Sequence, residues 1–125
     1  MINPNKVITA PANTEKFVRH PQAIRIPKDM QGWILKKVFI HFSPGCKTLT
    51  HVKIADRGGY MIPDPRITEL DYIFGDNVVF QFNVNMRVRE GSEFYIDYRN
   101  TDDDPHTFSV EFVFTQPAEK KGVGK

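Results

Sequence analysis

The sequence predicts an all-β protein, an antiparallel two-sheet β-sandwich for which a jelly roll is the expected arrangement. Three observations lead to this prediction. Apolar residues occupy every second position from Val78 to Val88, with polar residues between them from Gln81 onward, a period of two that no helix produces. None of the nine prolines falls between Pro65 and Pro105, where inner strands need every backbone donor. The ten phenylalanines have side chains that fit the pleated surface of a sheet.

Two further segments repeat this alternation. Apolar side chains occur at every second position of residues 94–98 and again of residues 108–114. Residues 100–105, between them, are rich in Asn, Asp and Pro, which favour turns, and residues 90–92 make a similar break. We therefore expect residues 77–115 to form a three-stranded antiparallel meander.

The remaining strands are expected in five shorter segments. Residues 33–42 are apolar on both faces except for two lysines, which is typical of a central strand. The other four segments are residues 17–19, 24–26, 49–55 and 70–74. The best candidate for a helical turn is residues 65–70. Eight strands separated by these turns match the spacing of about 8–12 residues that is typical of a sandwich or barrel.

Composition divides the chain into three parts. Residues 14–116 are expected to form the sandwich, residues 1–13 an extended N-terminal arm, and residues 117–125 a polar, basic C-terminal tail. The arm is interrupted by prolines and has few apolar anchors, so we expect it to bind neighbouring subunits. The expected assembly contacts at the two ends are Ile2, Val7, Ile8, Lys120 and Lys121.

The composition also argues against several classes of protein. The formal net charge is only +2 and the basic residues are scattered, which does not favour a nucleic-acid-binding surface. A single cysteine, Cys46, cannot form an internal disulfide. No segment approaches the ~18–20 apolar residues of a membrane helix, and the first residues lack the apolar core of a signal peptide. We expect a soluble protein that does not bind a membrane.

The sequence contains no organised catalytic or metal-binding constellation, so we expect a non-enzymatic protein without a cofactor or a metal. None of the four histidines belongs to a His-x-His or His-x-Asp/Glu pair, which would place two ligands on one face of a strand. Two alternatives stay open. His41 and His51 could meet across paired strands near Cys46, and the run Asp102–Asp104 could supply oxygen ligands to calcium.

Two sets of exposed side chains could bind a partner. Trp33, Tyr60 and Tyr95 are candidates for carbohydrate recognition, because aromatic rings stack on sugars and Tyr95 occupies an outward position of its strand. Arg87 and Arg89 share the polar face of one strand and are candidates for contact with another subunit.

Three segments together indicate a family resemblance: the arm (Met1–Asn13), the strand Gly91–Tyr98 and the final strand Phe108–Phe114. In this layout the chain resembles small single jelly-roll virion proteins, the decoration, cement, spike and minor capsid proteins of bacteriophages and other viruses. The resemblance implies a structural protein of the virion that forms a homo-oligomer, such as a trimer, and binds itself or a major capsid protein. The alternative is a carbohydrate- or receptor-binding sandwich module of a phage fibre or baseplate.

Overall fold

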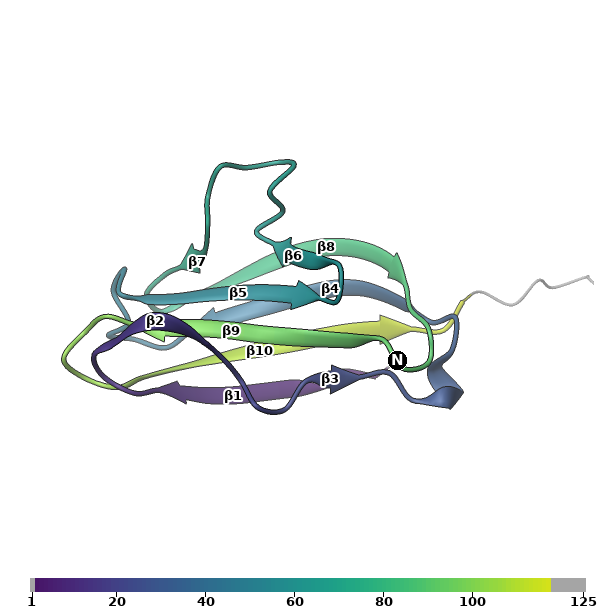
Figure 1. The fold of residues 1–125 in the computed structure, drawn as a ribbon, viewed down its shortest axis with the longest axis horizontal. Coiled ribbons are helices and arrows are strands. Elements are labelled where there is room, and N and C mark those ends of the chain that lie inside the picture. Colours follow the sequence, from purple (N-terminus) through teal and green to yellow (C-terminus); the bar gives the residue numbers. More distant parts are fainter. Residues whose placement is uncertain (1, 118–125) are drawn as a thin grey trace, which may run out of the picture.

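The computed structural model describes residues 2–117, which form two antiparallel sheets packed face to face (Figure 1). Sheet A contains β1 (Asn5–Ala10), β4 (Ile34–Phe42), β8 (Val78–Arg87) and β10 (His106–Thr115). Sheet B contains β2 (Thr14–Arg19), β3 (Ile24–Arg25), β5 (Thr50–Asp56), β6 (Gly59–Ile62), β7 (Ile73–Phe74) and β9 (Glu93–Asn100). A short 3₁₀ helix, η1 (Lys28–Met30), precedes β4. The predicted all-β, two-sheet sandwich is confirmed.

The strand order brings distant parts of the chain together. Sheet A has the order β1-β10-β4-β8, and sheet B has the order β2-β9-β5-β6, with β3 beside β9 and β7 beside β5. The last strand, β10, therefore lies inside sheet A between the first strand and β4. In the same way, β9 lies inside sheet B between β2 and β5.

The expected meander over residues 77–115 is wrong. β8 lies in sheet A and pairs with β4, β9 lies in sheet B, and β10 returns to sheet A. Alternation shows that a strand buries one face, but it carries no information about which strand lies beside it. The connections, residues 88–92 and 101–105, are long enough to cross the ~10 Å between packed sheets as well as to close a hairpin.

An aromatic core joins the inner faces of the two sheets. The ring centroid of Phe94 in β9 lies 5.8 Å from that of Phe112 and 6.2 Å from that of Phe114, both in β10. The rings of Tyr98 and Phe108 are 5.7 Å apart by the same measure. Fully buried aliphatic side chains from both sheets complete the core: Leu35, Val38, Ile40, Val52, Ile54 and Ile96. Contacts between β9 and β10 therefore hold the sheets together.

The expected N-terminal arm is wrong for residues 2–10, because they belong to sheet A. β1 pairs with β10 along its whole length, and Ile2 forms an isolated bridge to the end of β10. Ile8 is 4% exposed and Ala10 is fully buried, while Val7 faces solvent. The strand was missed because a lysine and a small alanine occupy two of its three inward positions, so its alternation is weak.

A loop of residues 63–72 projects from sheet B between β6 and β7 (Figure 1). Asp64 organises its start: the carboxylate accepts hydrogen bonds from the backbone and guanidinium of Arg66, and the carbonyl accepts two more from the N–H groups of Ile67 and Thr68. The strand expected over residues 70–74 is shortened to β7, and the helical turn expected beside it is this hydrogen-bonded turn.

Replacing Ile8 and Val7 by alanine, one at a time, tests the position of β1. Ile8→Ala removes a buried side chain and leaves a cavity, so it should lower the free energy of unfolding by about 2–4 kcal/mol. Val7→Ala changes a side chain that is 67% exposed, and its effect should stay within about 0.5 kcal/mol. Denaturant unfolding measures both values. Equal, small effects would mean that residues 5–10 form a free arm.

Candidate functional site

The outer face of sheet B carries an ordered set of aromatic, cationic and acidic side chains, which we call the sheet B cluster. Its members are Phe17, Arg19, His51, Lys53, Tyr60, Tyr72, Tyr95, Asp97 and Arg99. Sequence reasoning identified Tyr60 and Tyr95 of this set as binding candidates, and it considered His51 only for a site shared with His41 and Cys46. A usable signal was present, because Asp97 and Arg99 follow Tyr95 at every second position of β9 and therefore share its outward face.

The contacts of the cluster form two groups, one around Asp97 and one around His51. Asp97 is 4% exposed. Its carboxylate accepts two hydrogen bonds from the Arg19 guanidinium, at 2.8 and 3.1 Å, and one from the Tyr60 hydroxyl at 2.8 Å. The hydrogen bond to Asp97 raises the pKa of Tyr60, so its hydroxyl remains a donor at neutral pH. The buried carboxylate is therefore fully engaged in joining β2, β6 and β9.

His51 is the centre of the second group and stacks on Tyr72 with 4.0 Å between ring centroids. Its Nε2 lies 2.7 Å from the carbonyl oxygen of Thr48, and its Nδ1 accepts a hydrogen bond of 2.7 Å from Nε of Arg99. These partners select a neutral imidazole with its proton on Nε2. Burial is the main cause that lowers the pKa of His51, and the positive charge of Arg99 adds to it.

The structure brings together two of the three residues expected to bind carbohydrate. Tyr60 and Tyr95 both belong to the sheet B cluster, but a cation lies over one face of each ring. The guanidinium carbon of Arg19 is 4.3 Å from the ring centroid of Tyr95, and Nζ of Lys53 is 4.6 Å from that of Tyr60. Trp33 lies apart from them, half-buried against the core just before β4.

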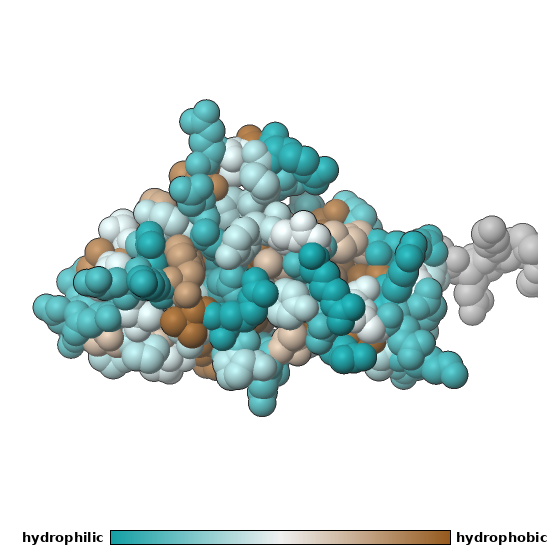
Figure 2. Space-filling model, in the orientation of Figure 1, coloured by the Kyte–Doolittle hydropathy of each residue, from teal (hydrophilic) through white to brown (hydrophobic). Residues whose placement is uncertain are grey.

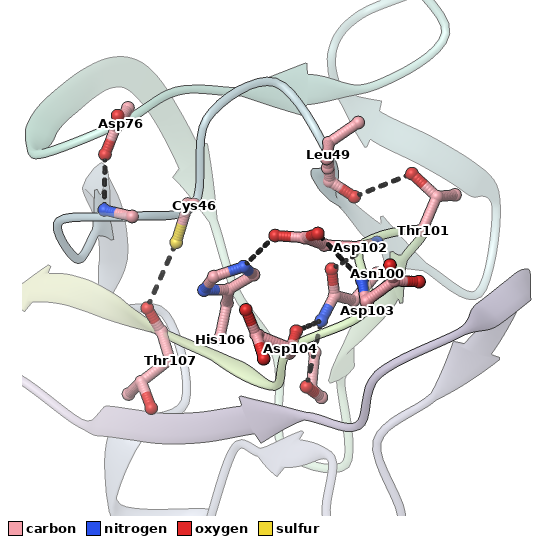
Figure 3. Close-up of polar contacts among 12 residues, drawn as sticks. Cys46, Leu49, Asp76, Asn100, Thr101, Asp102, Asp103, Asp104, His106 and Thr107 are labelled. Atoms are coloured by element: carbon pink, nitrogen blue, oxygen red, sulfur yellow. Dashed lines mark hydrogen bonds and ion pairs between the residues drawn. The ribbon is translucent and has the colours of Figure 1, made fainter.

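Loops at one end of the sandwich bring Cys46, His106 and Asp102 near one another (Figure 3). Nε2 of His106 lies 2.6 Å from Oδ2 of Asp102. The Cys46 thiol is buried and donates to the carbonyl oxygen of Thr107 over 3.6 Å, and burial raises the pKa of this thiol. A protonated thiol that is bonded to a backbone carbonyl is not prepared as a nucleophile.

The alternative in which His41 and His51 meet near Cys46 is wrong. His41 lies on the outer face of sheet A opposite Val79, whereas His51 lies on the outer face of sheet B. Within residues 2–117, no group of three or more His, Cys, Asp or Glu side chains is placed to hold a metal ion. In the run Asp102–Asp104, the carboxylate of Asp102 already forms a hydrogen bond with His106.

Arg87 and Arg89 line a cleft of about 340 Å³ where β8 ends and β9 begins. Arg25 of β3 and Arg57 of the β5–β6 turn line it as well, and we call it the arginine cleft. The Glu93 carboxylate lies 2.8 Å from Arg57 and 3.9 Å from Arg25, and its hydrogen bond to Arg57 lowers the pKa of Glu93. Within the described chain, Arg87 and Arg89 have no such carboxylate partner.

The remaining expected assembly contacts do not form one surface. Ile8 is wrong as a contact residue, because it lies in the core. Ile2 is 42% exposed at the end of sheet A, and Val7 lies on the outer face of that sheet. Lys120 and Lys121 lie outside the described residues.

The lowered pKa of His51 predicts a loss of stability in weak acid. The unfolded chain, in which the histidine pKa is near 6.5, binds the proton more readily than the folded chain. The free energy of unfolding should therefore be highest above that pH and should fall as the pH is lowered through it. Thermal unfolding measured from about pH 7.5 to about pH 5.5 tests this.

Two glutamine variants are the controls for this pH dependence. His51→Gln should reduce the dependence of the melting temperature on pH, leaving the smaller contribution of His20, whose pKa is also lowered by burial. His41→Gln removes an exposed histidine and should leave the dependence intact. The same dependence in all three proteins would contradict the role of His51.

Comparison with known proteins finds no family for the chain. No protein-family model matches it, and no curated protein matches it in sequence. Among residues 2–117 there is no helix with the length and apolar composition needed to span a membrane. The sheet B cluster, the group around Cys46 and the arginine cleft are therefore interpreted from their own geometry and charge.

Proposed function

We propose that the protein is a non-enzymatic structural component of a virus particle, and that it assembles with copies of itself through the free edge of β8. The composition of that edge is the observation that carries the proposal. Among residues 2–117, β8 has a neighbouring strand, β4, on one side only, so the backbone N–H and C=O groups of its other side have no strand partner there. A strand from a second copy can add to the sheet at this edge.

The strand order supports a jelly roll, the fold of the virion proteins that the sequence resembles in layout. β2 and β3 both pair with β9, and β6 and β7 both pair with β5, so each pair acts as one interrupted strand. Counted in this way, each sheet has four strands, as in a jelly roll of two Greek keys. The chain changes sheet at every connection between these strands except the one from β5 to β6.

The first part of β8, residues 78–83, is well suited to pairing with another strand. It pairs residue by residue with β4, and it contains no charged residue and no proline. Short uncharged segments of high β-propensity associate readily. A bulge follows, where Asn85 has a φ of 55°. Arg87, the one charged residue of β8, is the last residue of the strand. In an antiparallel pair of two copies the two arginines lie at opposite ends, so they do not repel each other.

The opposite edge of sheet A is protected in a way that β8 is not. β1 contains Lys6 and is bounded by Pro4 and Pro11. Lysine must keep its charge in water and proline has no backbone N–H, so both discourage edge-to-edge pairing. This difference directs self-association to the β8 side of the molecule.

Exposed apolar residues lie near the free edge of β8. Ile67 and Leu70 of the projecting loop are 83% and 57% exposed, and Val79 of β8 is 57% exposed. An apolar groove of about 450 Å³ separates this loop from β8. Figure 2 shows hydrophobic residues on the projecting loop. Apolar side chains grouped beside an open strand are typical of a contact with another protein.

Replacing Val79 by lysine tests the β8 contact. The lysine adds a charge to the exposed face of an edge strand, so the variant should self-associate about tenfold or more weakly than the parent protein. Val7→Lys is the matched control, because Val7 is similarly exposed on the same outer face, but in the opposite edge strand, β1. Light scattering over a range of protein concentrations measures the average mass of each.

Circular dichroism and thermal unfolding should show that both lysine variants remain folded. A lower average mass for Val79→Lys than for Val7→Lys supports the proposal. A parent protein that stays monomeric at every concentration would contradict it, and so would equal masses for the two variants.

The carbohydrate-binding alternative has less support from the geometry. It requires the faces of Tyr60 and Tyr95 to stack on a sugar, and one face of each ring is covered by Lys53 or Arg19. The cluster has a structural explanation of its own, since its ion pair and hydrogen bonds join strands of sheet B. We therefore do not advance carbohydrate recognition as a second function.

A further inference from the structure

Two oppositely charged features lie at opposite ends of β9. The arginine cleft contains the first residues of β9, and the run Asp102–Asp104 follows its last residue. β9 has eight residues, which separates the two features by roughly 25 Å at ~3.3 Å per residue. They cannot meet within one molecule, but each can meet its counterpart on a second copy.

The arginine cleft has the chemistry to hold carboxylates. Its four arginines, Arg25, Arg57, Arg87 and Arg89, surround a partly apolar floor that includes Met86, Val88 and Phe94. The lining has three carboxylates, and two of them are already engaged: Glu93 pairs with Arg25 and Arg57, and Asp56 accepts a hydrogen bond from the N–H of Gly58. Arg87 and Arg89 form no ion pair within residues 2–117. Each guanidinium can therefore offer two parallel donors to the two oxygens of a carboxylate.

The acidic loop is held in a defined shape by the buried side chain of Asn100 (Figure 3). Its Nδ2 donates to the carbonyl oxygens of Asp104 at 2.8 Å and Ala10 at 3.3 Å, and its Oδ1 accepts from the N–H of Asp102 at 3.1 Å. The carboxylates of Asp103 and Asp104 belong to exposed residues and form no ion pair within residues 2–117. A loop that is already ordered loses little conformational entropy when it binds.

We propose that the Asp103–Asp104 tip of one copy docks in the arginine cleft of the next copy. This contact rests on the proposed self-assembly and adds a head-to-tail interface to the pairing of β8 edges. A volume of about 340 Å³ is at the small end of the ~300–1,000 Å³ of typical binding pockets, which suits a loop tip. Because two different surfaces meet, repetition of the contact gives a closed ring or an open chain.

Charge-swap variants test the contact directly, in a Val79→Lys background that weakens the β8 contact. The loop variant carries Asp103→Lys and Asp104→Lys, and the cleft variant carries Arg87→Glu and Arg89→Glu. All four positions are exposed, so both variants should fold. In each variant the cleft and the loop now have the same sign of charge, so each should be monomeric by light scattering.

An equimolar mixture of the two variants is the decisive sample. The cleft of the loop variant is still basic and meets the acidic loop of the cleft variant, and the reverse contact is also complementary. The mixture should therefore recover the average mass of the Val79→Lys parent, and added salt should reduce that mass. A mixture that stays monomeric overturns the head-to-tail contact. So does a Val79→Lys protein that is itself monomeric, and so does a charge-swap variant that keeps the mass of the Val79→Lys protein.

These outcomes separate the two proposals. If the mixture fails while Val79→Lys still lowers the mass of the otherwise unchanged protein, the head-to-tail contact is wrong and assembly through β8 stands. If the mixture recovers the mass while Val79→Lys alone has no effect on the mass, assembly through β8 is wrong and the head-to-tail contact stands.

Discussion

The packing of β9 against β10 is the constraint on which the rest of the structure depends. Phe94 and Tyr98 of β9 reach across to Phe108, Phe112 and Phe114 of β10, so an inner strand of one sheet is held against an inner strand of the other. Because side chains alternate, this inward set also determines which residues of β9 face out: Tyr95, Asp97 and Arg99 in the sheet B cluster. The two ends of β9 then position the arginine cleft and the acidic loop.

The sequence predicted the elements of this fold better than their connections. Alternation identified β8, β9 and β10 because each buries one face. The absence of prolines between Pro65 and Pro105 correctly indicated strands there, but only β9 is the inner strand that was expected, since β8 is an edge strand. Pairing could not be deduced in the same way, because a five-residue connection serves a hairpin and a crossing between sheets equally well. β1 is harder to predict for a different reason. Lys6 and Ala10 on its inner face give little hydrophobic signal, although the backbones of both residues pair with β10.

The surfaces were harder to predict than the strands, because they combine residues that only the fold brings together. Tyr60 and Tyr95 were identified as outward aromatics, but the hydrogen bond of Tyr60 to Asp97 and the cations over both rings depend on the order of β2, β9, β5 and β6. Arg87 and Arg89 were identified from one strand, whereas Arg25 and Arg57 reach the same cleft from distant segments. Edge protection is the exception, since the prolines and lysine around β1 and their absence from residues 78–83 are visible in the sequence once the edges are known.

Self-assembly through an unprotected strand edge is the central claim, and amide hydrogen exchange at two protein concentrations tests it most directly. Where the protein is dilute, the amides of residues 78–83 that point away from β4 should exchange rapidly, since no strand within the described part of the chain pairs with them. Where it is concentrated, those amides should become protected, while the outward amides of β1 should exchange as before. Protection of residues 78–83 that does not change with concentration would contradict the claim.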